Sequence, residues 1–259
     1  MYLKTEEEIE LIRESSLLVG KTLAEVAKLI EPGVTTLRLD QMAEEFIRDN
    51  GGVPGFKGLY DCPSTLLTSV NSAVVHGLPS KEPLRDGDIV SVDCGVLMNE
   101  FYGDVAYTFE VGEVADDIKK LLSVTKLCLQ KGIEAAVAGN RVGDIGYAVQ
   151  TVAEDNGYGV VRELVGHGLG KKLHEEPQVP NYGKRGQGAK LKEGLVIAIE
   201  PMINMGKRHV KQGEDGWTIY AKDGLPSAHF EHDVLVRKGK AEVLSTHELI
   251  EEVLKNKIK

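Results

Sequence analysis

Apolar residues recur at helical spacing in five parts of the chain. Thr5 and Glu8 form a capping-box pattern before the first part, and Pro32-Gly33 ends it. Thr36 can cap the second part, which ends at Asn50-Gly51-Gly52. The pattern predicts helices at about residues 5–30, 36–50, 117–137, 143–156 and 247–255.

Short apolar runs lie between these helical parts. They predict strands at residues 89–94, 105–111, 195–199 and 234–236. No Pro/Ser-rich linker or low-complexity segment divides the chain, so we expect one domain over residues 1–259.

Two parts of the chain resemble each other at an offset of 106–107 residues. Residues 32–51 resemble 138–157, and the acidic strand at 86–93 resembles 193–200. Asp93 and Glu200 are then equivalents. If the repeat is real, it predicts two half-domains at about residues 1–112 and 113–259. A pseudo-two-fold axis between them would bring the two acids together. Chance similarity between two helix–loop–strand units is the alternative.

The segment 89–111 is typical of an acidic hairpin. A turn centred on Met98-Asn99 would place Asp93 directly opposite Asp104, with Cβ atoms about 4.5–5.5 Å apart. The other residues of that face are small: Ser91, Gly95, Ala106 and Thr108. The opposite face is apolar and should pack on the core; its residues are Val90, Val92, Cys94, Val105, Tyr107 and Phe109. Opposed carboxylates repel, and a bound cation would reverse that repulsion. A solvated hairpin face is the alternative.

The second half of the sequence adds further candidate ligands. Glu200 ends one apolar run, and Glu231 precedes another within the segment 229–233. His167 lies between two glycines, where the backbone can approach closely, and His174 follows seven residues later. Each residue alone is more often structural. Together, four carboxylates and one imidazole indicate a pair of divalent ions, with manganese, iron(II), cobalt and zinc all open.

Composition narrows the function classes. The formal charge of −9 is unfavourable for nucleic-acid binding. The first ten residues lack a signal-peptide pattern, and no stretch reaches the roughly 20 apolar residues of a membrane helix. Three scattered cysteines do not indicate a disulfide framework, which favours a cytoplasmic protein. The H-E-x-x-H, P-loop and G-x-S-x-G motifs are absent.

These motifs, taken jointly and in order, resemble the type I methionine aminopeptidases in their short bacterial form. The matching stretches are 70–71, 75–79, 88–93, 102–104, 166–170, 174–178, 199–202, 216–218 and 231–232. The resemblance implies an α+β pita-bread fold, with two pseudo-two-fold-related halves and a central antiparallel sheet covered by helices. It implies removal of the N-terminal methionine from nascent polypeptides, with a hydroxide bridging two metal ions as the nucleophile.

The resemblance also assigns roles to residues. The implied metal ligands are Asp93, Asp104, His167, Glu200 and Glu231, with Asp104 and Glu231 bridging both ions. His76 and His174 would contact the substrate around the scissile amide, and Glu200 would shuttle the proton. The implied methionine pocket comprises Phe56, Leu59, Cys62, Leu67 and Trp217. A sodium or potassium ion near Asn71 and Ser227 is implied by the same route.

The pocket departs from the family pattern. Leu59 and Cys62 stand where aromatic residues are common, and Leu67 stands where cysteine is common. Selectivity for methionine is therefore less firmly implied than the chemistry. The expected partners are nascent N-termini, with transient ribosome contact, no membrane, and a monomeric enzyme.

Three other interpretations remain. A prolidase-like aminopeptidase of the same fold usually carries a separate N-terminal domain. A non-catalytic pita-bread binding protein usually lacks one or more ligands, whereas all five positions are filled here. A structural acidic protein would leave the histidine–glycine motif without a purpose.

Overall fold

The computed structural model describes residues 1–257. Its helices are α1 (Glu6–Leu29), α2 (Thr36–Asp49), α3 (Asp116–Ala135), α4 (Val142–Asp155) and α5 (Glu248–Lys257), so all five predicted helices are confirmed. Both bonds of the capping box at Thr5 and Glu8 form. The predicted cap of the second helix is wrong by one residue. Thr35, in extended backbone conformation, accepts from the Arg38 N–H, and Thr36 is already helical.

The strands form four antiparallel sheets. They are β1 (Val53–Pro54), β2 (Leu66–Val70), β3 (Ala73–Val75), β4 (Ile89–Met98), β5 (Phe101–Glu110), β6 (Gly159–Val160), β7 (Gly166–Gly168), β8 (Glu175–Val179), β9 (Val196–Ile199), β10 (Met202–Asn204), β11 (Val210–Gln212), β12 (Ile219–Ala221), β13 (Ser227–His229), β14 (His232–Leu235) and β15 (Glu242–Val243). Strand β4 pairs with β1, β2 and β5. The other sheets run β15-β14-β9-β7-β8, β13-β10-β6 and β11-β12-β3. The four predicted strands correspond to β4, β5, β9 and β14.

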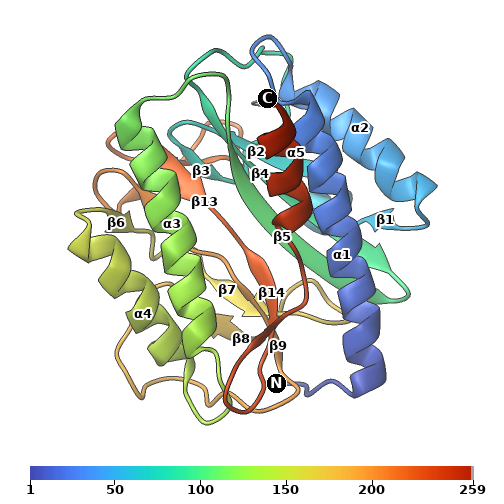
Figure 1. Cartoon of the computed structure of the whole chain (residues 1–259), viewed down its shortest axis with the longest axis vertical. Coiled ribbons are helices and arrows are strands. Elements are labelled where there is room, and N and C mark those ends of the chain that lie inside the picture. Colours follow the sequence, from blue (N-terminus) through green and yellow to red (C-terminus); the bar gives the residue numbers. More distant parts are fainter. Residues whose placement is uncertain (258–259) are drawn as a thin grey trace.

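The helices cover one side of the sheets. In Figure 1, α3 and α4 lie side by side on one half, and α1 and α5 lie on the other, in front of the strands. The path β2-β4-β5 after α1 and α2 is matched by β7-β9-β14 after α3 and α4. This recurrence agrees with the repeat found in the sequence. One apolar core joins both parts, and Phe109 and Phe230 are among its largest fully buried side chains.

The hairpin of β4 and β5 has a different register from the predicted one. Asn99 and Glu100 form the turn, both with positive φ, and Met98 pairs with Phe101. Asp93 therefore faces Ala106, and Asp104 faces Gly95. The prediction that Asp93 faces Asp104 is wrong by two positions. Because an even shift keeps every side chain on its face, the predicted apolar face is nevertheless in the core.

The corresponding ladder in the second half is interrupted. Ile199 pairs with His232, and Met202 pairs with His229, in one continuous register. That register places Glu200 across from Glu231, where neither residue belongs to a strand. Direct opposition of two acids thus occurs in the second half rather than the first.

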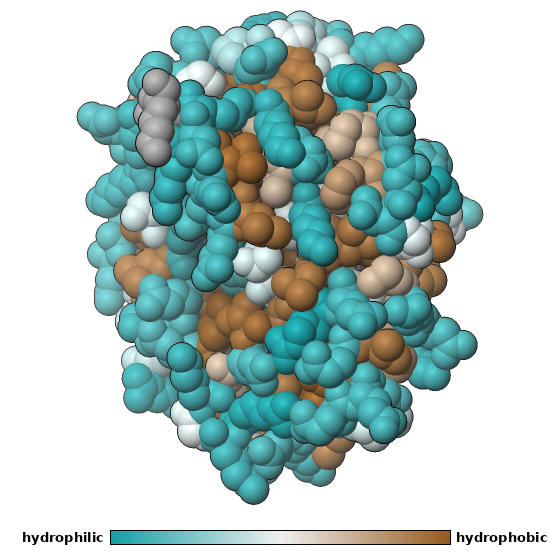
Figure 2. All heavy atoms as spheres, turned by 45° about the vertical axis from the view of Figure 1, so that its right-hand side comes forward, coloured by the Kyte–Doolittle hydropathy of each residue, from teal (hydrophilic) through white to brown (hydrophobic). Residues whose placement is uncertain are grey.

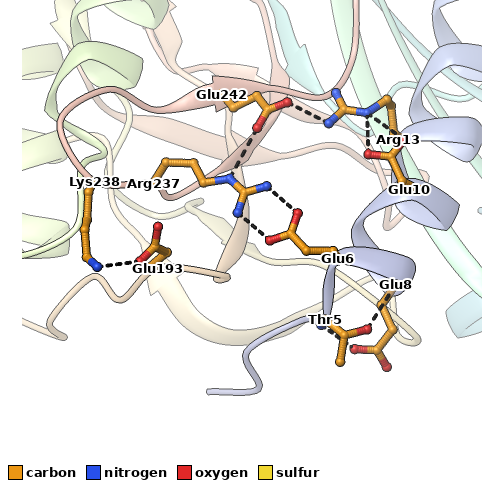
Figure 3. A network of polar contacts seen from close by, with 9 residues as sticks. All are labelled: Thr5, Glu6, Glu8, Glu10, Arg13, Glu193, Arg237, Lys238 and Glu242. Atoms are coloured by element: carbon orange, nitrogen blue, oxygen red, sulfur yellow. Dashed lines mark hydrogen bonds and ion pairs between the residues drawn. The ribbon is translucent and has the colours of Figure 1, made fainter.

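Ion pairs fasten the first helix to the C-terminal strands. Arg237 binds both carboxylate oxygens of Glu6, at 2.5 and 2.6 Å, and its Nε lies 3.3 Å from Glu242 (Figure 3). Glu242 also accepts from Arg13 of α1 at 2.7 Å. These partly exposed contacts tie the two ends of the chain together.

The surface is mostly polar. Figure 2 shows apolar side chains in groups between hydrophilic ones, on the side that carries α1 and α2. Within residues 1–257, no helix combines the length and apolar character needed to cross a membrane.

Candidate metal centre and active site

One cavity brings together the predicted site residues of both halves. It encloses about 610 Å³, including its open mouth. Its lining consists of Phe56, Leu59, Tyr60, Cys62, Leu67, His76, Asp93, Asp104, His167, Leu173, His174, Glu200, Trp217 and Glu231. All predicted metal, catalytic and pocket residues are in this set. Asn71 and Ser227 are not.

Four carboxylates enter the cavity from two strand pairs. Asp93 on β4 and Asp104 on β5 come from the first half, and Glu200 and Glu231 come from the interrupted ladder of the second. Asp104 and Glu231 are only 4% and 2% exposed. The Glu231 N–H donates to the carbonyl of Ala106 at 3.0 Å, which holds the two strand pairs together.

His167 lies between the carboxylates of both halves. Its Nε2 is 3.8 Å from Asp104 Oδ2 and 3.6 Å from Glu200 Oε1. Its Nδ1 is 2.9 Å from the Gly168 carbonyl, which can only accept, so Nδ1 carries the proton. The lone pair of Nε2 is therefore directed at the carboxylates, in the tautomer that a metal ligand needs.

Two glycines allow β7 to approach its neighbours closely. A Cβ on Gly166 would lie 2.3 Å from the Ala198 carbonyl oxygen, and one on Gly168 would lie 2.5 Å from that of Glu176. Any larger residue would push β7 away from β8 or β9. The expectation of close backbone approach beside His167 is confirmed.

Burial disfavours charge throughout the centre. It raises the pKa of Asp93 to about 7 and lowers the pKa of His167 to about 4. Burial also raises the pKa of three further carboxyls well above the usual range, with repulsion from neighbouring carboxylates added; these are Asp104, Glu200 and Glu231. The described residues form no Lys or Arg ion pair with these four groups, so a cation would relieve the repulsion.

The donor set fits divalent cations. Ligand atoms of Asp104, His167 and Glu231 all lie within 4.8 Å of one another. One oxygen each of Asp93, Asp104 and Glu231 is buried without a hydrogen-bond partner. Buried orphan carboxylate oxygens next to a free imidazole lone pair are suited to oxygen-preferring or borderline divalent metals.

Apolar residues form one wall of the cavity. Phe56, Cys62 and Leu67 belong to a second hydrophobic cluster, against which Leu59 and Trp217 pack. His76 follows β3 with φ of 59°, a conformation uncommon outside glycine. Burial lowers the pKa of His76 and of His174, so both are neutral at pH 7.

Asn71 and Ser227 meet away from the cavity. The Ser227 N–H donates to the Asn71 carbonyl at 2.9 Å, and the Ser227 hydroxyl donates to the Ile203 carbonyl at 3.2 Å. The two residues are adjacent, as the implied alkali site requires. The ion itself stays a prediction.

Sequence reasoning missed four residues at or beside this site. Tyr60 and Leu173 line the cavity, and Tyr60 stacks on His174 with ring centroids 5.7 Å apart. His229 is buried, with Nε2 3.8 Å from Glu200 Oε2, and Asp233 bonds the backbone of Asp104. For the last two, the signal was alternation with Glu231 in the segment 229–233.

Comparison with known proteins agrees with this geometry. The family model described as metallopeptidase family M24 matches residues 10–238. A methionine aminopeptidase of Clostridium perfringens is 48% identical over 94% of this chain and 98% of its own length. The crystal structure of the Rickettsia prowazekii methionine aminopeptidase superposes with a TM-score of 0.93 at 38% identity, covering 95% of this chain and 100% of that one.

A prolidase shares the fold less completely. The Pyrococcus furiosus prolidase matches with a TM-score of 0.77 and 25% identity, and 66% of its chain is covered. Both neighbours have the pita-bread fold that the resemblance implied. The chain belongs to metallopeptidase family M24 and, within it, to the methionine aminopeptidases.

Proposed function

We propose that this chain removes the N-terminal methionine from other polypeptides by metal-assisted hydrolysis of the first peptide bond. The observation that carries the proposal is one cavity lined by five ligand-type side chains, two neutral histidines and a set of apolar residues. The names of its relatives point to the same reaction.

Two divalent ions would be held by the five side chains around His167. The residues that would hold them are Asp93, Asp104, His167, Glu200 and Glu231. Four carboxylates carry enough charge to offset two such ions. Bound there, the ions would polarise the scissile carbonyl and lower the pKa of a water molecule.

The chain's own groups would handle the proton and the substrate. Glu200 would accept a proton from the attacking water and pass it to the leaving nitrogen. His174 would donate a hydrogen bond to the developing oxyanion, and His76 would bond near the scissile amide. As neutral imidazoles, both can donate without repelling the free α-amine of the substrate.

The apolar wall would receive the methionine side chain. Phe56, Leu59, Cys62, Leu67 and Trp217 offer a flexible thioether a mostly apolar surface. The cavity mouth is open to solvent, so the rest of the polypeptide can extend outward. We further propose a monomer acting in the cytoplasm on nascent chains, with transient ribosome contact and a sodium or potassium ion near Asn71 and Ser227.

A peptide assay tests the proposal. EDTA-treated protein is reloaded anaerobically with Mn²⁺ or Co²⁺ and given Met-Ala-Ser, Leu-Ala-Ser, Ala-Ala-Ser and a dipeptide ending in proline. We expect the first peptide to be cut fastest, and only after reloading. A preference for Leu-Ala-Ser would refute a methionine pocket. Preferential cleavage of the proline dipeptide would favour a prolidase, and no hydrolysis at all would favour a binding protein.

A further inference from the structure

A fifth carboxylate lies behind the centre and does not line the cavity. Asp233 is on β14, two residues beyond Glu231 and on the same side of the chain. Its side chain is fully buried. It lies where β14 contacts β5, and β5 in turn packs against α1.

Asp233 is bonded to the first half by one oxygen. Its Oδ2 accepts from the Asp104 N–H at 2.9 Å and from the Ser16 hydroxyl at 2.6 Å. The Ser16 hydroxyl also lies 2.8 Å from the Ile12 carbonyl, but it has only one proton. The shorter contact to a charged acceptor takes that proton. The carboxylate thus links α1, β5 and β14 at the position of Asp104.

The other oxygen of Asp233 has no partner. Oδ1 is buried without a hydrogen bond, and no Lys or Arg among residues 1–257 pairs with this carboxylate. Accepting a hydrogen bond from the Asp104 N–H does not require a negative charge at position 233. An amide or hydroxyl could accept that bond at lower desolvation cost.

We propose that Asp233 is a positioning residue for the metal centre, which fixes Asp104 through its backbone and strengthens divalent-cation binding through its charge. The inference rests on the proposed function, because it takes the cations to bind at Asp104 and Glu231. The buried charge destabilises the metal-free fold and is compensated when cations bind. A purely structural residue would stabilise the metal-free fold, whereas the Asp233 charge is expected to lower its stability and to strengthen cation binding.

The test replaces the charge while keeping an acceptor. Asp233→Asn retains an oxygen for the Asp104 N–H and the Ser16 hydroxyl. Calorimetric titration of EDTA-treated protein with Mn²⁺ at pH 8, where the Asp233 carboxyl is largely ionised, should show affinity weakened by about 10- to 100-fold. The Tm of the metal-free variant should be unchanged or higher, by about 2 °C or more if the repulsion is fully relieved. Mn²⁺ affinity within about twofold of wild type would overturn the proposal.

Asp233→Thr gives a second neutral side chain with an acceptor, in case the asparagine variant does not fold. The same loss of Mn²⁺ affinity is expected. Ser16→Ala removes only the hydroxyl donor and keeps the charge. Its Tm should fall by about 2–6 °C while Mn²⁺ binds within about threefold of wild type. A larger affinity loss in Ser16→Ala than in Asp233→Asn would contradict a role for the charge.

Asp40 is the matched control. It is also a buried aspartate, 7% exposed, and its Oδ1 accepts from the Thr65 and Leu66 N–H groups at 2.8 Å. It does not line the cavity. Asp40→Asn should change thermal stability without changing Mn²⁺ affinity, and an equal affinity loss there would overturn the proposal. If wild type binds no Mn²⁺, the proposed function fails; if wild type binds and Asp233→Asn binds equally, only this inference fails.

Discussion

The two halves of the molecule bring their acids to the centre by different routes. In the first half, β4 and β5 form an unbroken hairpin whose turn sets the register, and Asp93 and Asp104 lie two positions apart on one face. In the second half, β9-β10 and β13-β14 form one ladder interrupted at Glu200 and Glu231, which lie directly across from each other. The two halves therefore share the order of their strands but differ in the register of their acids.

Regular strand pairing is interrupted where two acids lie directly across from each other. Directly opposed like charges destabilise a sheet. In the second half, the ladder opens at that position, and the Glu231 N–H bonds to Ala106 of the first half instead. The interruption frees the Glu231 backbone from its own ladder for this bond to the other half. A cation would then bind both halves rather than a single hairpin.

The largest expected effect comes from removing one proposed metal-binding carboxylate from either half. Asp104→Asn and Glu231→Gln should each lower kcat/KM by about 10⁴-fold, because several kcal/mol of electrostatic stabilisation would be lost. Steady-state kinetics with Met-Ala-Ser and metal analysis of both variants check this. If only one variant were impaired, the halves would not contribute jointly to one centre.

A smaller effect is expected for His76, which we propose contacts the substrate and not the ions. His76→Ala should lower turnover by about 10²–10⁴-fold, the range typical of positioned polar groups, while two ions per chain remain bound. Turnover and metal content are measured on the same sample of the His76→Ala variant. Unchanged turnover would exclude the proposed contact near the scissile amide.

The buried acids also predict how stability depends on pH. In EDTA-treated protein, burial raises the pKa of Asp93 and Asp233 to about 7, whereas unfolded carboxyls titrate near 4. The folded state therefore takes up protons that the unfolded state does not, and Tm should rise as pH falls from 8 to about 6.5. Below about 6.5 the rise should level off, because burial lowers the pKa of His167 to about 4 and of His229 to about 3, and these groups protonate only on unfolding.

Thermal unfolding in EDTA at several pH values measures this dependence. With excess Mn²⁺, the trend between pH 8 and 6.5 should reverse, because protons compete with the ions for the same oxygens. A Tm that falls from pH 8 to 6.5 in EDTA would show that burial does not raise the pKa of these two carboxyls in the folded chain.

The smallest expected effect concerns Tyr60, which covers the mouth from the first half. Its hydroxyl is 3.4 Å from His174 Nδ1, and the residue is 69% exposed. Tyr60→Phe should change kcat/KM by about twofold or less, because an exposed hydrogen bond contributes little. Tyr60→Ala should raise KM several-fold by removing the stacked ring. If both variants changed the kinetic constants equally, the Tyr60 hydroxyl rather than the stacked ring would account for the effect.

Much of this arrangement could be predicted from the sequence. Helical spacing located all five helices, and period-two alternation gave the correct faces of the first hairpin. Faces follow from local alternation and survive any even shift of register. The four acids and His167 were candidate ligands from their places beside apolar strands, the resemblance assigned their roles, and the cavity brings those five residues together.

Register and tertiary neighbours could not be predicted in the same way. The turn at Asn99-Glu100 has positive φ at two residues that are not glycine, and an Asn-Glu pair is not a strong turn signal. Tyr60 reaches His174 through a strained loop, with φ of 52° at Tyr60. The bond between Asp233 and Ser16 spans 217 positions, and no periodicity within either segment encodes it.

We propose above that side chains of both halves hold two divalent cations in one cavity. Diffraction from crystals of anaerobically Mn²⁺-loaded protein, with anomalous data at the manganese edge, tests it most directly. We expect two anomalous peaks about 3.5–4 Å apart, between Asp93, Asp104, His167, Glu200 and Glu231. Peaks elsewhere on the chain, or none in this cavity at saturating Mn²⁺, would contradict it.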